Sequence, residues 1–259
     1  MAVRDFGMLL QFASSLADDA RAIARRFFRG DDGAEQKDDR TPVTKADRAI
    51  ERRWRERIAA EFPHDGVLGE EEGAVRLDAE WLWVLDPIDG TKAFASGNPM
   101  FGSLLGLMHR GDPVLGVLDA PALGERWLGA RGLGASRDGA PIRVRAPRPL
   151  GRAVMYCTTP DPMRQVAGFE RLRQHVQWTV YGGDCISYAL VASGTADLVV
   201  DRGLKPYDWC ALVPIVTEAG GVMVDWEMAP LGLGSSGAVI TAASRELAQA
   251  ASAELVAAG

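Results

Sequence analysis

The chain has 259 residues, of which 47% are hydrophobic and 25% are charged, and its formal net charge is −6. This is the composition of an ordinary globular protein with a sizeable core, and no apolar stretch approaches the length of a membrane span. The excess of acidic residues argues against nucleic acid as a main partner. The cysteines, 3 in number and widely spaced, indicate neither a disulfide framework nor a zinc site. Because the N-terminus carries charges and no cleavable apolar segment, we expect a cytoplasmic protein.

Two amphipathic helices are predicted at the start of the chain. Apolar side chains recur at three- and four-residue spacing between Phe6 and Phe27, which is typical of one buried helix face. A second helix is predicted from about Lys45 to Glu61. Thr44 and Asp47 form a capping-box pattern at its start. Its arginines are interpreted as a solvated face paired with acidic residues; they are Arg52, Arg53, Arg55 and Arg57.

Strand-like segments follow in the rest of the first half. Val67–Leu68 is short and apolar, whereas Trp81–Leu85 is apolar throughout and rich in aromatic and branched residues. Ser103–His109 and Val114–Asp119 flank a turn sequence and are predicted to form a hairpin. Asp138-Gly139 marks a further turn. The first half of the chain therefore indicates two helices followed by an antiparallel sheet.

In the second half, short strands alternate with helices, which indicates a layered α/β arrangement. Helices are predicted near 162–174, 184–193, 208–219 and 243–257, and strands at Val154–Cys157, Trp178–Tyr181, Leu198–Asp201, Val222–Asp225 and Ala238–Ala242. Pro147 and Pro149 mark the predicted joint, so we expect an N-terminal α+β half, residues 1–150, and a C-terminal α/β half, residues 151–259. The tryptophans predicted to fill the core are Trp81, Trp83, Trp127 and Trp178.

Acidic residues follow two of the predicted strands. Gly69–Gly73 carries consecutive glutamates after Val67–Leu68, and taken alone it is interpreted as a solvated turn. Asp86 and Asp89 come directly after the apolar strand 81–85, at a strand end where ligands of layered α/β proteins commonly sit. Two carboxylates cannot be buried together without cations, because their desolvation costs too much. Since only oxygen ligands are offered, a hard divalent metal is the natural counter-ion.

Gly90, Thr91 and Asp208 lie at predicted helix starts. Gly90 allows a backbone N–H group to come close to a ligand, and a helix starting near Thr91 would offer free N–H groups to a phosphate. Asp208 opens the predicted helix 208–219, and taken alone it is interpreted as the N-cap of that helix. Pro214 within this helix is expected to remove one backbone hydrogen bond and to bend the helix.

Taken together, these segments resemble the signature sequences of the inositol monophosphatase family. The resemblance rests on Gly-Glu-Glu at 69–71, Trp-Val-Leu-Asp-Pro-Ile-Asp-Gly-Thr at 83–91, and Asp208 followed by Glu-Ala-Gly-Gly at 218–221, with matching order and spacing along nearly the whole chain. It implies an α/β (α+β) fold, the αβαβα layered sandwich of that family. It also implies an enzyme that uses Mg²⁺ to hydrolyse a phosphate monoester. The expected partner is a small phosphorylated metabolite, and neither nucleic acid nor a membrane is expected as a partner.

The resemblance also implies metal-binding roles for individual residues. Glu70, Asp86 and the Ile88 carbonyl correspond to ligands of a first metal. Asp86, Asp89 and Asp208 correspond to ligands of a second metal, so that Asp86 bridges the two. Under this hypothesis Asp208 comes from the other half of the chain, and the site forms only when the halves pack together.

Phosphate binding and catalysis are assigned by the same resemblance. Gly90 and Thr91 correspond to the phosphate cradle, and Glu70 and Thr91 are expected to orient the attacking water. Asp47 corresponds to the residue that orients Thr91. Glu71 is expected to be either an acid behind the metal ligands or a ligand of a weaker third metal.

Other positions resemble the histidinol-phosphate phosphatase branch of the family more than typical inositol monophosphatases; they are Gly183-Asp184, Pro206-Tyr207 and Lys92. Histidinol phosphate carries an amine and an imidazole, so acidic side chains are natural partners, and Asp184 and Asp201 are the candidates. Asp184 is alternatively the N-cap of the helix 184–193, and Asp201 is alternatively a surface residue at a strand end. The predicted function is hydrolysis of histidinol phosphate to histidinol and phosphate, a step of histidine biosynthesis.

Three alternatives to this function stay open. The chain is alternatively an inositol-1-phosphate phosphatase, with the same chemistry, or a non-catalytic regulatory protein that retains the fold. It is alternatively a relative of bisphosphate nucleotidases, although the short connection between the two acidic motifs argues against this. Every metal-ligand position that can be matched is intact, which argues against the regulatory protein. The sequence does not decide the oligomeric state, although homodimers are common in the family that the chain resembles.

Overall fold

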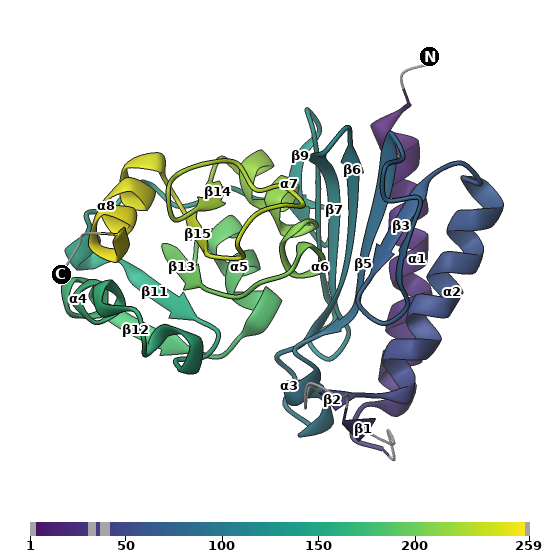
Figure 1. Ribbon diagram of the computed structural model, residues 1–259, viewed down its shortest axis with the longest axis horizontal. Coiled ribbons are helices and arrows are strands. Elements are labelled where there is room, and N and C mark those ends of the chain that lie inside the picture. Colours follow the sequence, from purple (N-terminus) through teal and green to yellow (C-terminus); the bar gives the residue numbers. More distant parts are fainter. Residues whose placement is uncertain (1–3, 31–34, 37–41, 257–259) are drawn as a thin grey trace.

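The protein folds into five layers, as the computed structural model shows for residues 4–30, 35–36 and 42–256 (Figure 1). An eight-stranded sheet and a five-stranded sheet alternate with three layers of helices. The outer layers are α1 (Phe6–Phe27) with α2 (Lys45–Glu61), and α4 (Ala167–His175) with α8 (Arg245–Val256). The layer between the sheets contains α5 (Asp184–Ala192), α6 (Pro206–Trp209) and α7 (Leu212–Glu218). This arrangement confirms the predicted αβαβα sandwich.

The larger sheet contains β3 (Gly66–Gly69), β4 (Gly73–Val75), β5 (Trp81–Asp89), β6 (Gly102–His109), β7 (Asp112–Ala120), β8 (Glu125–Ala130), β9 (Gly134–Arg137) and β10 (Ala140–Pro141). Their order is β10-β9-β8-β7-β6-β5-β3-β4. Neighbours are antiparallel except β3 and β5, which run parallel. The predicted hairpin is β6–β7, and the predicted turn at Asp138-Gly139 joins β9 to β10, so both predictions are confirmed. A separate small sheet pairs β1 (Glu35–Gln36) with β2 (Pro42–Val43).

Helices α1 and α2 pack on the larger sheet through the apolar faces that their periodicity predicts. The predicted capping box begins α2: the Thr44 hydroxyl accepts a hydrogen bond from the Ala46 N–H (3.2 Å), and Asp47 Oδ2 accepts one from the Thr44 N–H (2.8 Å). Trp54 is fully buried, and its indole N–H donates to the Leu16 carbonyl oxygen (2.8 Å). This aromatic side chain joins the two helices, and burying its apolar area contributes about 2 kcal/mol.

The smaller sheet contains β11 (Val154–Cys157), β12 (Trp178–Tyr181), β13 (Leu198–Asp201), β14 (Val222–Asp225) and β15 (Val239–Ala242), in the order β12-β11-β13-β15-β14. β11 runs parallel to both of its neighbours, and the other pairs are antiparallel. The helix predicted at 162–174 begins only at Ala167, because the proline-containing segment before it forms a 3₁₀ turn, η2 (Asp161–Met163). Trp178 was predicted to fill the core, but it lies on the edge strand β12 and is 62% exposed.

Three glycines on neighbouring strands bring the central helices close to the larger sheet. Gly106, Gly116 and Gly129 lie opposite one another on β6, β7 and β8. A Cβ atom at Gly116 would lie 1.8 Å from the Ala211 carbonyl oxygen, so the turn between α6 and α7 rests directly on the sheet backbone. This close packing fixes the position of α6, the helix that carries Asp208.

The helix predicted over 208–219 is divided into two helices, although Cys210 and Ala211 between them keep right-handed helical dihedral angles. α6 ends at Trp209 and α7 begins at Leu212. Pro214 therefore lies in the first turn of α7, where backbone N–H groups have no partner within the helix. The predicted loss of a backbone hydrogen bond at Pro214 agrees with this interruption, because proline has no N–H group to donate to the Cys210 carbonyl oxygen four residues earlier.

The central helices also join the two predicted halves of the chain. One apolar core contains Leu118 and Trp127 from the first half together with Ile186 and Ile215 from the second. The division of the chain near residue 150 stays a prediction. In the described part of the chain, no helix combines the length and the apolar character that a membrane crossing requires.

Candidate active site

The larger sheet brings two acidic segments to the same end of neighbouring strands. β3 and β5 run parallel with Gly69 opposite Leu85, so Glu70 and Asp86 follow paired positions. The Glu70 N–H donates to the Leu85 carbonyl oxygen (3.2 Å). The strand predicted to end at Leu85 continues to Asp89, with an irregular register after Asp86. Asp86 and Asp89 therefore both lie at the carboxyl end of β5 in the larger sheet.

Helix α6 adds an acid from the second half of the chain. Asp86, Asp89 and Asp208 each offer one carboxylate oxygen, and these oxygens lie within 4.8 Å of one another. Asp208 is the third residue of α6, and its Oδ2 accepts a hydrogen bond from the Lys205 N–H (2.6 Å). The interpretation of Asp208 as an N-cap is therefore wrong. The structure shows acids from distant parts of the sequence meeting at one place.

The carboxylates of this group repel one another in a buried environment. Burial raises the pKa of Asp86 well above its ordinary value, and the negative charge of Glu70 raises it further. Burial, followed by the charge of Asp208, raises the pKa of Asp89 to about 7. The pKa of Asp208 is also raised to about 7, chiefly by burial. A buried charge without a counter-ion costs several kcal/mol, so the ionised form of this site requires cations.

The atoms that the site offers fit a hard divalent cation. Asp86 Oδ1 is buried and, within the described ranges, has no hydrogen-bond partner. The candidate ligand atoms of Asp86, Asp89 and Asp208 are all oxygens. Hard cations such as Mg²⁺ prefer oxygen ligands, and a cation would satisfy both the charge and the unpaired oxygen.

Glu70 and Ile88 are the other predicted metal ligands. The charge of Glu70 raises the pKa of both Asp86 and Asp208, which indicates that its carboxylate lies near theirs. The Ile88 carbonyl oxygen accepts a hydrogen bond from the Thr91 hydroxyl (3.0 Å), and a carbonyl oxygen has a second lone pair. Metal binding by Glu70 and Ile88 stays a prediction.

A short helix begins at the predicted phosphate cradle. α3 (Thr91–Ala95) starts directly after Gly90, whose φ of +84° is a left-handed conformation that glycine adopts without strain. A Cβ atom at Gly90 would lie 3.0 Å from Asp184 Oδ2 and 3.1 Å from the Met100 carbonyl oxygen, so a larger residue would also be too crowded. The predicted helix start at Thr91 is confirmed, whereas phosphate binding there stays a prediction.

Asp47 does not make the predicted contact with Thr91. Its Oδ2 accepts hydrogen bonds from the N–H and the hydroxyl of Thr44, whereas the Thr91 hydroxyl donates to the Ile88 carbonyl. Asp47 Oδ1 is buried and has no hydrogen-bond partner among the residues that the structure describes. Burial raises the pKa of Asp47 to about 7, and the charge of Glu71 contributes to the shift. The hydrogen bonds that cap α2 thus fix the orientation of the Asp47 side chain.

The two predicted substrate contacts are both acids with little exposure to solvent. Asp184 is the first residue of α5, whose N-cap is Gly183, so the interpretation of Asp184 as an N-cap is wrong. Burial is the main cause that raises the pKa of Asp184 to about 7. Asp201 is 3% exposed and accepts hydrogen bonds from the hydroxyls of Tyr188 (2.6 Å) and Thr158 (2.9 Å). Asp201 is therefore not a surface residue.

Two further groups hold site residues in place, and the sequence predicted neither of them. The Cys185 N–H at the start of α5 donates to Asp89 Oδ2 (2.6 Å). This contact comes from the backbone, so the identity of residue 185 gives no signal for it. Glu51 is buried on α2 and accepts a hydrogen bond from the Glu71 N–H (2.8 Å). Its signal in the sequence is an acid four residues after Asp47, on the same face of the helix.

Comparison with known proteins agrees with this architecture. The model of the inositol monophosphatase family matches residues 7–258. A chloroplastic bifunctional phosphatase from Arabidopsis thaliana is 42% identical over 217 residues, which are 82% of this chain but only 63% of that protein, less than two thirds of its length. A histidinol-phosphatase from Mycobacterium tuberculosis is 40% identical over 225 residues, 82% of this chain and 85% of that protein. The solved structure of an inositol monophosphatase from Zymomonas mobilis has a TM-score of 0.89 and 42% identity, covering 98% of this chain and 99% of that one.

The match to the family model includes the acidic residues of the candidate site. Glu70, Asp86, Asp89 and Asp208 all lie inside the segment that the family model covers. The likeness in structure extends over nearly the whole chain and therefore includes both sheets. The chain belongs to the inositol monophosphatase family and is a phosphatase of that family.

Proposed function

We propose that the protein is a Mg²⁺-dependent phosphatase that hydrolyses histidinol phosphate to histidinol and phosphate. The observation that supports the metal dependence is the group formed by Asp86, Asp89 and Asp208, whose carboxylate oxygens lie within 4.8 Å of one another. Acids buried in such a group are stable as anions only beside cations. In this proposal, Glu70 and the Ile88 carbonyl oxygen would hold the cations together with these three aspartates.

Divalent cations bound there would supply the positive charge that a phosphate dianion needs and would lower the pKa of water. The residues of the chain position the reactants. In this proposal, Gly90 and Thr91 hold the phosphate, and Glu70 and the Thr91 hydroxyl orient the attacking water. Asp47 Oδ1, which is buried without a partner among the described residues, is the proposed acceptor for the Thr91 hydroxyl during catalysis.

Two observations support a cationic substrate such as histidinol phosphate. Asp184 Oδ2 lies against Gly90, within 3.0 Å of where a Cβ atom would be, so this acid borders the proposed phosphate cradle. The charges of Asp89 and Asp201 oppose its ionisation, and a bound amine or imidazolium would offset that repulsion. In this proposal Asp184 and Asp201 bind the cationic part of the substrate. The relative from Mycobacterium tuberculosis is named a histidinol-phosphatase, which agrees with this proposal.

An inositol-1-phosphate phosphatase is the second candidate, because the structurally similar protein from Zymomonas mobilis is an inositol monophosphatase. The test compares kcat/KM for histidinol phosphate and inositol 1-phosphate with Mg²⁺ and again with EDTA. We expect a preference of at least about 10-fold for histidinol phosphate, because it alone carries cationic groups, and no turnover with EDTA. Near-equal values would reject the narrow assignment and retain the phosphatase. Failure to hydrolyse any small monoester would favour a non-catalytic protein.

A further inference from the structure

The carboxylate of Glu51 is enclosed between α2 and the turn that carries Glu70. Glu51 lies one helical turn after Asp47, and its side chain is 0% exposed. Arg55, one turn further along α2, forms an ion pair with it, with 2.7 Å between Arg55 Nη2 and Glu51 Oε1. The positive charge of Arg55 therefore balances the buried Glu51 carboxylate, whose oxygens can accept further hydrogen bonds.

The Glu51 carboxylate contacts the backbone on both sides of Glu70. Its Oε2 accepts a hydrogen bond from the Glu71 N–H (2.8 Å), and its Oε1 accepts one from the Glu72 N–H (3.0 Å). On the preceding side, a Cβ atom at Gly69 would lie 2.0 Å from Glu51 Oε1, so the carboxylate rests directly against Gly69. One side chain of α2 thus accepts hydrogen bonds from the N–H groups of the two residues after Glu70 and packs against the residue before it.

The hydrogen bonds to Glu51 hold the Glu71 and Glu72 N–H groups, which lie beyond the paired residues of β3 and β4. The last pair between β3 and β4 is Gly69 with Gly73, so residues 70–72 form the turn beyond the ladder. Arg55 binds the far end of this turn as well, since its Nη2 donates to the Gly73 carbonyl oxygen (2.5 Å). We infer that Glu51 is the positioning residue for Glu70: it fixes the turn from which Glu70 reaches the proposed metal site. This inference rests on the proposed function.

Glu51→Gln tests the inference without changing the size of the side chain. The glutamine NH₂ group is a donor, so one of the two backbone N–H groups loses its acceptor and faces another donor instead. We expect the Kd for Mg²⁺, measured by isothermal titration calorimetry, to rise by about 10- to 100-fold. The Mg²⁺ concentration for half-maximal activity should rise by the same factor, and kcat should recover at saturating Mg²⁺.

Asp65→Asn is the matched control. Asp65 is also a buried acid paired with an arginine, with 2.6 Å between Asp65 Oδ2 and Arg4 Nη1, but it lies at the opposite end of β3 from Glu70. We expect this variant to have a lower Tm and an unchanged Kd for Mg²⁺. The pair of variants separates a loss of positioning at the site from a general loss of stability.

Gly69→Ala tests the contact between Gly69 and the Glu51 carboxylate by changing Gly69 in place of Glu51. Its methyl group would collide with the Glu51 carboxylate, so Mg²⁺ binding should weaken in the wild-type background. In a Glu51→Ala background the remaining close contact is Arg55 Nη2, 2.7 Å from the added Cβ atom, which is the end of a flexible side chain and can shift. Gly69→Ala should therefore weaken Mg²⁺ binding much less in that background. Equal, additive losses in both backgrounds would overturn the inference.

The calorimetric results distinguish this inference from the proposed function. An unchanged Kd for Mg²⁺ in Glu51→Gln, or an equal rise in Asp65→Asn, would overturn the role of Glu51 and leave the proposed function intact. A wild-type protein that binds no divalent cation would overturn the proposed function and this inference with it.

Discussion

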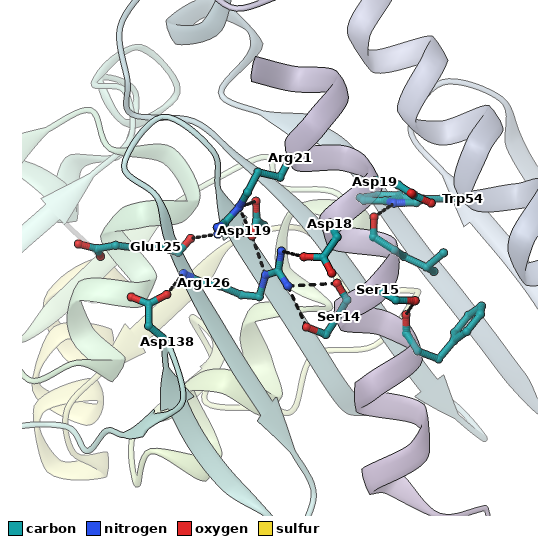
Figure 2. Close-up of polar contacts among 12 residues, drawn as sticks. Ser14, Ser15, Asp18, Asp19, Arg21, Trp54, Asp119, Glu125, Arg126 and Asp138 are labelled. Atoms are coloured by element: carbon teal, nitrogen blue, oxygen red, sulfur yellow. Dashed lines mark hydrogen bonds and ion pairs between the residues drawn. The ribbon is translucent and has the colours of Figure 1, made fainter. Parts of the chain in front are cut away.

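Two groups of charged residues in this molecule contain buried acids, and the surroundings of these acids differ. Figure 2 shows the first group, between α1 and the larger sheet, where Asp119 on β7 contacts Arg21 from α1 and Arg126 from β8. Both guanidinium groups approach Asp119 Oδ1 to 2.7 Å, and Asp119 is fully buried. Arg126 also donates to Asp18 Oδ1 (2.7 Å) and to the Ser14 hydroxyl (2.8 Å), as the same view shows. Here arginines of the chain itself neutralise the buried acid.

The second group is the candidate active site, formed by Asp86, Asp89 and Asp208 with Glu70 nearby. Within the described part of the chain, no arginine forms an ion pair with these three aspartates, and the pKa of each is raised by burial and by neighbouring acids. The difference indicates that an acid with a structural role is neutralised by the fold, whereas the acids of the site depend on cations from solution.

The largest expected effect is that of Asp89→Asn, which removes one of the charges in the second group. The asparagine carbonyl can still accept the hydrogen bond from the Cys185 N–H, so the fold should be retained. With Mg²⁺ we expect kcat to fall by about 10³-fold, which corresponds to about 4 kcal/mol in the activation barrier. Steady-state kinetics measure this loss, and circular dichroism checks the fold. An unchanged kcat would rule out the proposed mechanism.

Asp119→Asn tests the first group, where we expect a loss of stability in place of a loss of activity. The substitution leaves the Arg21 and Arg126 guanidinium groups facing a neutral amide, and breaking such a buried pair costs about 3 kcal/mol in the free energy of unfolding. Urea denaturation measures this change. The kcat of the folded enzyme should be unaffected; a variant that keeps its stability but loses activity would contradict the contrast between the two groups.

A smaller effect, confined to one kind of substrate, is expected for Asp184→Asn. If Asp184 binds the cationic part of histidinol phosphate, KM for that substrate should rise by about 10-fold, or about 1.4 kcal/mol, with little change for inositol 1-phosphate. Asp161→Asn is a suitable control, because Asp161 is an exposed acid whose side chain is 74% accessible. Equal changes for both substrates would argue against a contact between Asp184 and the cationic group.

The smallest effect that we expect is a change with pH in the Tm of the metal-free protein. The pKa values of Asp89 and Asp208 are raised from an ordinary value of 3.8 to about 7, so the folded state binds more protons than the unfolded state between these pH values. The free energy of unfolding therefore decreases as pH rises from about 4 to about 7. In EDTA, Tm should be a few degrees higher at pH 5.5 than at pH 8.

Adding Mg²⁺ sharpens this test. Cations stabilise the ionised carboxylates, so the rise in Tm that Mg²⁺ produces should be larger at pH 8 than at pH 5.5. Differential scanning calorimetry at both pH values measures this. A metal-free Tm that increases with pH would show that the acids of the site are neutralised within the fold, as Asp119 is.

Much of the fold follows from patterns within short segments of the sequence. Apolar periodicity locates α1 and α2, and the capping pair Thr44 and Asp47 fixes where α2 begins. The apolar segment before Asp86 identifies a buried strand, and acids directly after such a strand indicate a metal site. These signals are reliable because caps and periodicity act between residues a few positions apart.

Contacts between distant segments decided the rest. Trp178 is exposed because it lies on an edge strand, and Asp201 is buried because Tyr188 and Thr158 surround it; neither follows from the residue type. The position of α6, and with it Asp208, depends on close packing against a row of glycines from three strands.

The candidate site shows the same division. The sequence by itself determined which acids are present, which strand ends carry them and, through their resemblance to a family, which chemistry to expect. Only the tertiary structure decided that Asp201 is buried, that the Cys185 N–H donates to Asp89, and that Glu51 binds the turn around Glu70. The physical reason is that burial and the pKa of an acid depend on which segments pack around it, and local sequence does not specify those neighbours.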